Sequence, residues 1–251
     1  MLKRRVIPLE LWEKGRLVKT VRFEPGRDVG DPVKSSQVYS DQDADELLLL
    51  NIRGSADDMP LFSETIRRIA SCCFVPLSVG GGIRSLQDAD ILFSAGADKV
   101  VLNTAAYHES HIITEISQKY GSQAIIISID YRWGDGEPRL FSESGSKEEK
   151  VTLKKHLENI AGKGGGEIML QSMERDGLMG GYDQDLLRAL AAKVPAPMIL
   201  AGGAGNFSHL VEAFEAGADA VACGSLFNFG DNNPIRAKAY LKNHGIQIRK
   251  F

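Results

Sequence analysis

The sequence predicts an α/β protein, a single (β/α)8 TIM barrel with an internal half-barrel duplication. Three observations support this fold class: eight short apolar runs, eight amphipathic stretches that alternate with them, and glycine-rich segments that repeat half a chain apart. Eight βα units fit a chain of 251 residues, because barrels of this class typically need ~250 residues. A doubly wound open sheet is the alternative arrangement of the same units.

The apolar runs are short and continuous, as expected for parallel strands that are covered on both faces. The predicted strands are Arg5–Leu11, Glu46–Ile52, Pro76–Gly81, Asp98–Asn103, Ala124–Asp130, Glu167–Ser172, Met198–Gly202 and Asp219–Gly224. The longest predicted loops, Gly15–Asp31 and Tyr131–Lys150, follow the carboxyl ends of the first and fifth strands. Barrels of this class carry their active sites at that end.

Between the strands, apolar residues recur every three or four positions, which is typical of helices with one buried face. The clearest helical stretches are Pro60–Cys72, Leu86–Ala95, Ser110–Lys119, Leu153–Ala161, Leu186–Ala192 and Ser208–Ala216. Pro32–Asp41 is a weaker helix, and Asn233–His244 is a closing helix with Gly245 just past its end. Glycine is common at that position because it tolerates the left-handed backbone.

Composition excludes several classes of protein. The 30 basic and 33 acidic residues give a net charge of −3, which argues against a nucleic-acid binder. Cys72, Cys73 and Cys223 are odd in number and form no CxxC motif, which indicates reduced cytoplasmic cysteine. No signal-peptide core and no apolar run of ~20 residues is present, so no membrane association is expected. No metal-ligand spacing is visible, and we expect neither metal nor cofactor.

The chain also repeats itself. Residues 79–104 match residues 200–225 with an offset of 121 positions, and Glu46 and Glu167 share that offset. Chance explains one such match but not many in register. We therefore expect two fused half-barrels, at about residues 1–122 and 123–251.

Paired glycine clusters are the strongest local signal in the sequence. Gly80–Gly82 ends the third predicted strand, and Gly202–Gly203 ends the seventh. Glycine lets backbone N–H groups approach an anion closely, and Thr104, Ser225 and the helix start at Asn206 can add further donors. Tight turns alone are the alternative explanation for one cluster. The symmetric pair favours two phosphate sites, and so a substrate with a phosphate at each end.

Two carboxylates are candidates for acid–base chemistry at the same end of the barrel. Asp130 ends the fifth strand and should point into the mouth. Asp176 follows the sixth strand, where a turn or cap role is about equally consistent with its position.

A charged set lies at the opposite end. Arg5, Glu46, Lys99 and Glu167 each fall near the beginning of a predicted strand, so they could form a closed ring of ion pairs. From the residues alone, ordinary surface pairing is the better explanation. Cys223 is better explained as core packing than as a metal ligand.

With these residues in view, the sequence resembles the cyclase subunit of imidazole glycerol phosphate synthase, the HisF family. The resemblance runs from Met1 to about Arg249 without obvious gaps. Its landmarks are Lys3–Pro8, Gly30–Pro32, Gly80–Ile83, Gly96–Val100, Asn103–Thr104, Gly121–Gln123, Arg175–Gly177, Gly181–Asp183 and Gly202–Gly205. This set is highly specific, and it supports the duplication and the two phosphate sites.

The resemblance implies roles for particular positions. A HisH-like glutaminase would dock at the N-terminal face, near Asp98 and Gln123, and its ammonia would enter through a charged gate. The gate positions match Arg5, Glu46, Lys99 and Glu167, which now favours a gate over surface pairing. The candidate substrate- and phosphate-binding residues are Lys19, Gly81, Gly82, Asn103, Thr104, Asp176, Gly177, Gly202, Gly203, Gly224 and Ser225.

One departure from the family pattern matters most. The cyclase uses two aspartates across the mouth; one matches Asp130, and the other falls at Leu11. A leucine cannot exchange a proton, and losing a general catalyst typically costs ~10²–10⁴-fold in rate. Glu10 is adjacent, but strand alternation should point it to the opposite face unless a bulge intervenes. Another family aspartate, on the second strand, is here Asn51.

Leu9–Phe23 and Cys73–Phe74 instead resemble a group of HisF paralogues linked to surface-polysaccharide or flagellar sugars. These proteins work with a HisH-like glutaminase and a sugar amidotransferase that forms an acetamidino group. Three hypotheses follow: an ammonia-conducting barrel of that type, which we favour, a genuine cyclase, and a non-catalytic scaffold that binds a small phosphorylated ligand and activates a glutaminase.

Overall fold

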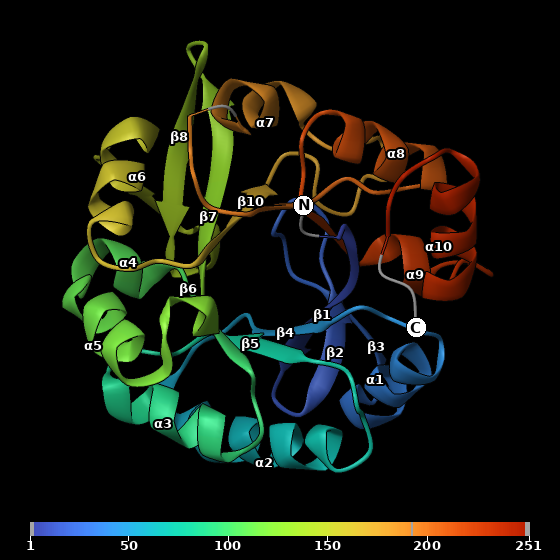
Figure 1. Ribbon diagram of the computed structural model, residues 1–251. Helices are drawn as coiled ribbons and strands as arrows, with labels where there is room; N and C mark the ends of the chain where they lie inside the picture. Colours follow the sequence, from blue (N-terminus) through green and yellow to red (C-terminus); the bar gives the residue numbers. More distant parts are fainter. Residues whose placement is uncertain (1–2, 192, 249–251) are drawn as a thin grey trace.

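Eight parallel strands close into a barrel in the computed structural model, which describes residues 3–191 and 193–248 (Figure 1). β1 pairs with both β4 and β12, and β7 pairs with both β6 and β10, so the sheet has no free edge in this circuit. The barrel strands, in order, are β1 (Arg5–Glu13), β4 (Leu47–Asn51), β5 (Leu77–Gly80), β6 (Lys99–Leu102), β7 (Ile125–Gly134), β10 (Glu167–Ser172), β11 (Met198–Ala201) and β12 (Ala220–Cys223). The predicted (β/α)8 barrel is confirmed, and the open-sheet alternative is wrong.

Helices surround the strands, as Figure 1 shows. The larger ones are α1 (Pro32–Asp41), α2 (Met59–Ala70), α3 (Leu86–Ser94), α5 (His111–Tyr120), α6 (Leu153–Ala161), α7 (Gln184–Ala191), α8 (Phe207–Glu215) and α10 (Pro234–Asn243). Short turns add α4 (Thr104–His108), α9 (Ser225–Asn228), η1 (Ala56–Asp58), η2 (Ser122–Ala124) and η3 (Glu143–Gly145). Ala192, the last residue of the predicted helix Leu186–Ala192, lies outside the described residues. No helix of the described part is long and apolar enough to cross a membrane.

Both predicted long loops contain hairpins that the apolar pattern did not predict. β1 turns back into β2 (Arg16–Lys19), which pairs with β3 (Arg27–Gly30), and β7 turns back into β8 (Glu137–Ser142), which pairs with β9 (Lys147–Glu149). The first hairpin turns at Lys14–Gly15 and the second at Asp135–Gly136, with positive φ at all four residues. Such two-residue turns suit the twist of antiparallel strands.

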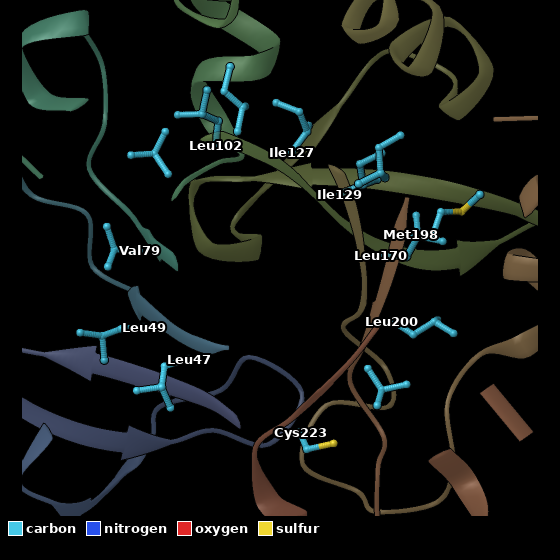
Figure 2. Close-up of a cluster of buried hydrophobic side chains, with 14 of the residues drawn as sticks. Leu47, Leu49, Val79, Leu102, Ile127, Ile129, Leu170, Met198, Leu200 and Cys223 are labelled. Carbon is cyan, nitrogen blue, oxygen red and sulfur yellow. The ribbon is translucent and has the colours of Figure 1, made fainter. Parts of the chain in front are cut away.

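Side chains of the barrel strands form two separate apolar clusters, because successive residues point to opposite faces. The outer cluster lies between strands and helices and includes Leu47, Leu49 and Val79 (Figure 2). The inner cluster fills the barrel and consists of Ile7, Leu9, Leu48, Val101, Ile126, Met169, Ile199, Ala201, Ala220 and Ala222, with Leu11 and Leu50 packed against it.

Elements of the two chain halves correspond closely. α3 and α8, β5 and β11, and β6 and β12 have matching bounds at the 121-residue spacing of the sequence repeat. Ser85 caps α3 and Asn206 caps α8, each through a side chain that accepts a backbone N–H three residues on. These correspondences are what a duplicated half-barrel would produce; the division at residue 122 stays a prediction.

Candidate active site and charged ring

Strand register shows that Leu11 and Asp130 hold equivalent positions in the two halves. Leu11 pairs with Leu50, and Asp130 pairs with Gln171. Leu50 and Gln171 are separated by the same 121 positions as the repeat. Leu11 packs against the inner cluster. The barrel mouth therefore has a carboxylate in its second half where its first half has a leucine.

Asp130 is buried, and its carboxylate accepts a hydrogen bond from the Ser128 hydroxyl at 2.9 Å. Burial raises its pKa to about 7, and the nearby Asp176 charge acts in the same direction. A carboxyl group with a pKa near the working pH can both take up and release a proton. Asp130 is therefore suited to acid–base work, a role that stays a prediction.

Glu10 does not replace the missing carboxylate. It accepts a hydrogen bond from the Ser36 hydroxyl at 2.6 Å, behind the strand and under α1. The β1–β4 register runs without a bulge from Leu9 to Trp12. Glu10 consequently points out of the barrel, and burial raises its pKa. A bulge at Glu10, which would turn its carboxylate into the barrel, is therefore absent from β1.

One cavity gathers most of the predicted residues of the second half. It is lined by Leu9, Leu11, Lys19, Thr20, Asp176, Gly177, Gly202, Gly203, Ala204, Ala222, Gly224 and Ser225. Lys19 is buried there and donates from Nζ to the Leu9 carbonyl at 2.8 Å. Burial lowers the pKa of Lys19 to about 8, although Glu10 and Asp176 oppose that shift.

Asp176 fastens the segment after β1 over this cavity. Its carboxylate accepts the Thr20 hydroxyl at 2.7 Å and the Phe23 N–H at 3.4 Å. Burial raises the pKa of Asp176 despite these hydrogen bonds. Gly177 has φ +71°, and a Cβ there would lie 2.5 Å from the Thr20 carbonyl oxygen. Asp176 therefore holds the segment after β1 in position. Its role in substrate binding stays a prediction.

Asn103 and Thr104, the first-half counterparts of Gly224 and Ser225, contact residues outside this cavity. The Asn103 amide donates to the carbonyls of Ser128 and Phe141, at 3.2 and 3.3 Å. The Thr104 hydroxyl accepts the Glu143 N–H at 3.0 Å.

The glycines at the two strand ends are required by the backbone itself. A Cβ on Gly81 would lie 2.0 Å from the Asn51 carbonyl oxygen, and one on Gly202 would lie 2.6 Å from that of Ser172. Gly82 and Gly203 also have positive φ. Close turns thus explain these glycines sufficiently, and phosphate binding remains a prediction for both clusters.

At the opposite end, the four charged residues form a closed ring. Glu46 accepts from Arg5 and from Lys99, both at 2.8 Å. Glu167 accepts from Lys99 at 2.7 Å and from both terminal nitrogens of Arg5. The Glu46 side chain is only 3% exposed, so the expectation of ordinary surface pairing is wrong. Burial alone would raise the pKa of Glu167, but Arg5 and Lys99 bring it below its usual range.

Asp98 and Gln123 lie exposed near the same end. Asp98 accepts the Leu77 N–H at 2.8 Å, and the Gln123 amide donates to the Tyr120 carbonyl at 3.0 Å. Each side chain bonds a backbone group at this face and stays exposed to solvent. In the described residues, no group of three His, Cys, Asp or Glu side chains is placed to hold a metal ion.

Sequence reasoning missed Ser128, Thr20 and Gln171. Ser128 and Gln171 could have been found by carrying the inward alternation of their strands through to the mouth. Thr20 could not, because its contact with Asp176 depends on how a long loop folds back.

Comparison with known proteins agrees with the landmarks of the sequence. The family described as "Histidine biosynthesis protein" matches residues 5–233. "Imidazole glycerol phosphate synthase subunit HisF" of Thermotoga sp. (strain RQ2) is 40% identical over 249 residues, which cover 99% of this chain and 98% of that protein. A match of this extent leaves no large segment of either chain unaccounted for. The chain therefore belongs to the HisF family of histidine biosynthesis proteins.

Proposed function

We propose that this protein is a HisF-type synthase subunit that receives ammonia from a HisH-like glutaminase and conducts it through the barrel. One observation carries the proposal: Leu11 stands at the position equivalent to Asp130, while the charged ring at the other end is complete. A barrel that only delivers ammonia needs the entrance but not the acid–base pair.

The proposal also names an acceptor for the ammonia. We infer amidination of a surface-polysaccharide or flagellar sugar by a separate sugar amidotransferase, from the resemblance of Leu9–Phe23 to that paralogue group. The matched family and the Thermotoga protein both carry histidine-pathway names, so the sugar acceptor rests on the resemblance alone.

A cyclase assay tests whether the ring-closing chemistry is lost. The purified protein, the phosphoribulosyl aminoimidazole carboxamide substrate and an ammonium salt at alkaline pH would be combined, and imidazole glycerol phosphate measured. Wild type should be silent and Leu11→Asp should gain activity. Leu50→Asp, on the adjacent strand of the same half, is the matched control and should gain none.

A genuine cyclase of histidine biosynthesis is the second candidate. It is favoured by Asp130, whose pKa of about 7 suits proton transfer, and by the name of the 40% identical relative. Efficient turnover by wild type in the same assay would establish it and would end the ammonia-only proposal.

A scaffold that merely activates the glutaminase would not pass ammonia. In the complex with a HisH-type glutaminase and the sugar amidotransferase, Lys99→Trp should abolish formation of the amidinated sugar while glutamine hydrolysis continues. Lys119→Trp, at an exposed lysine paired with Asp90, controls for a bulky surface substitution. Unchanged product from the Lys99 variant would favour the scaffold.

A further inference from the structure

Gln171 has an unpartnered polar atom inside the barrel. It lies on β10 in register with Asp130 on one side and Ala201 on the other. Glu167 and Met169 precede it on the inward face of the strand, so its side chain also points inward. The residue is 6% exposed, and its buried Oε1 has no hydrogen-bond partner among the described residues.

Between the charged ring and Gln171 the interior is apolar except for Ser128, which lies level with Met169. The inner cluster of Leu, Ile, Val, Met and Ala side chains fills this length of the interior. Above Met169, the Ser128 hydroxyl donates to the Asp130 carboxylate, and Gln171 lies in register with Asp130. A small polar molecule moving up the barrel would therefore meet its first hydrogen-bond partners at the group formed by Ser128, Asp130 and Gln171.

We propose that Gln171 and Asp130 form a binding site for ammonia at the top of the barrel interior. Ammonia carries three N–H donors, so one molecule can donate both to Gln171 Oε1 and to the Asp130 carboxylate. A buried carbonyl without a donor is costly, and an occupant that supplies one is stabilised. The inference rests on the proposed conduction of ammonia and names where the ammonia is held before transfer.

NMR of the isolated protein tests this binding directly. The side-chain amide signal of Gln171 would be assigned by its loss in Gln171→Met, which preserves length and volume. Ammonium chloride would then be added at pH 9 and constant ionic strength, with potassium chloride in a parallel series. We expect a saturable shift of the Gln171 signal with ammonium only, weakened in Asp130→Asn.

The amide of Gln184, which donates to Glu212 on the outer helices, is the internal control and should not respond. A Gln171 signal that does not shift, or shifts equally with potassium, would overturn the site. The thermal transition of Gln171→Met checks that the variant folds.

The two proposals fail separately. If Lys99→Trp uncouples glutamine hydrolysis from product but the Gln171 signal ignores ammonium, conduction stands and this site is wrong. If the Gln171 signal responds but Lys99→Trp has no effect on product, the site binds ammonia and the route through the ring is wrong.

Discussion

The stability of the fold should depend on pH through the titration of Asp130. Burial raises its pKa from 3.8 to about 7, so the unfolded chain ionises first as pH rises. The stabilising contribution is complete below pH ~4 and is lost as pH rises to ~7. Relative to Asp130→Asn, wild type should lose roughly 3 kcal/mol between pH 5 and 8, at ~1.4 kcal/mol per pKa unit. Urea unfolding of both proteins at the two pH values measures this difference, and a constant difference would contradict it.

Arg5 offers a second test at the level of one side chain. It pairs with Glu46 and Glu167, both largely buried. Arg5→Met would leave two buried carboxylates sharing the charge of Lys99, with the Ser78 hydroxyl still donating to Glu46, and we expect a loss of ~3 kcal/mol in unfolding free energy. Arg16→Met, which breaks an exposed and solvent-screened pair with Asp28, should cost far less. Equal losses in chemical denaturation would show that burial of the ring is energetically unimportant.

The elements of the fold differ in how far the sequence predicts them. All eight barrel strands lie where short apolar runs predict them, because strands buried on both faces need apolar residues throughout. The β2–β3 pair has no apolar run: β2 is buried after its first residue but ends in Lys19, and β3 has only exposed and half-buried positions. Asp135–Gly136 is a strong turn signal for β7–β8, but it is decisive only once strands are known on both sides.

The orientation of Trp12 at the mouth likewise could not be predicted from the sequence. It follows the predicted first strand, where it could line the pocket or cover the rim. The structure extends β1 past it and buries the ring against Phe62, with 5.0 Å between ring centroids. Alternation places Trp12 on the outer face, but only if the strand is known to continue. Leu11, on the inner face, was predictable because it lies within the apolar run.

Three hydrogen bonds hold the segment between β1 and α1 to Asp176, and the one from Thr20 is the shortest. Thr20 donates to Asp176 across the mouth at 2.7 Å. Thr20→Val removes this bond at a cost of ~1 kcal/mol to the folded state, so backbone amides of residues 16–30 should exchange hydrogen faster through local opening. Thr114→Val, which removes a bond to the Lys163 carbonyl elsewhere, is the control. Unchanged exchange in the segment would mean that the Thr20 hydrogen bond does not hold it.

For the whole molecule, the barrel was predictable from the alternation of apolar runs and amphipathic stretches, and the repeat from matches 121 residues apart. The closure of the ring and the depth of its burial were not, since Arg5, Glu46, Lys99 and Glu167 meet only when four strands are brought together. The same holds for the orphaned oxygen of Gln171. Properties that depend on several strands at once are absent from any single stretch of sequence.

If the half-barrels are structural units, the molecule should tolerate a new opening between them better than within one. Arg4 donates its N–H to the Gln247 carbonyl at 3.2 Å, so these two residues lie close enough for the short linker that circular permutation requires. A permutant opened at Ser122 keeps four βα units continuous in each half, whereas one opened at Phe74, also between a helix and the next strand, divides the first half. The first should unfold in one transition near the wild-type Tm and the second at a lower temperature. The reverse order in calorimetry would show that the repeat has no counterpart in cooperative unfolding.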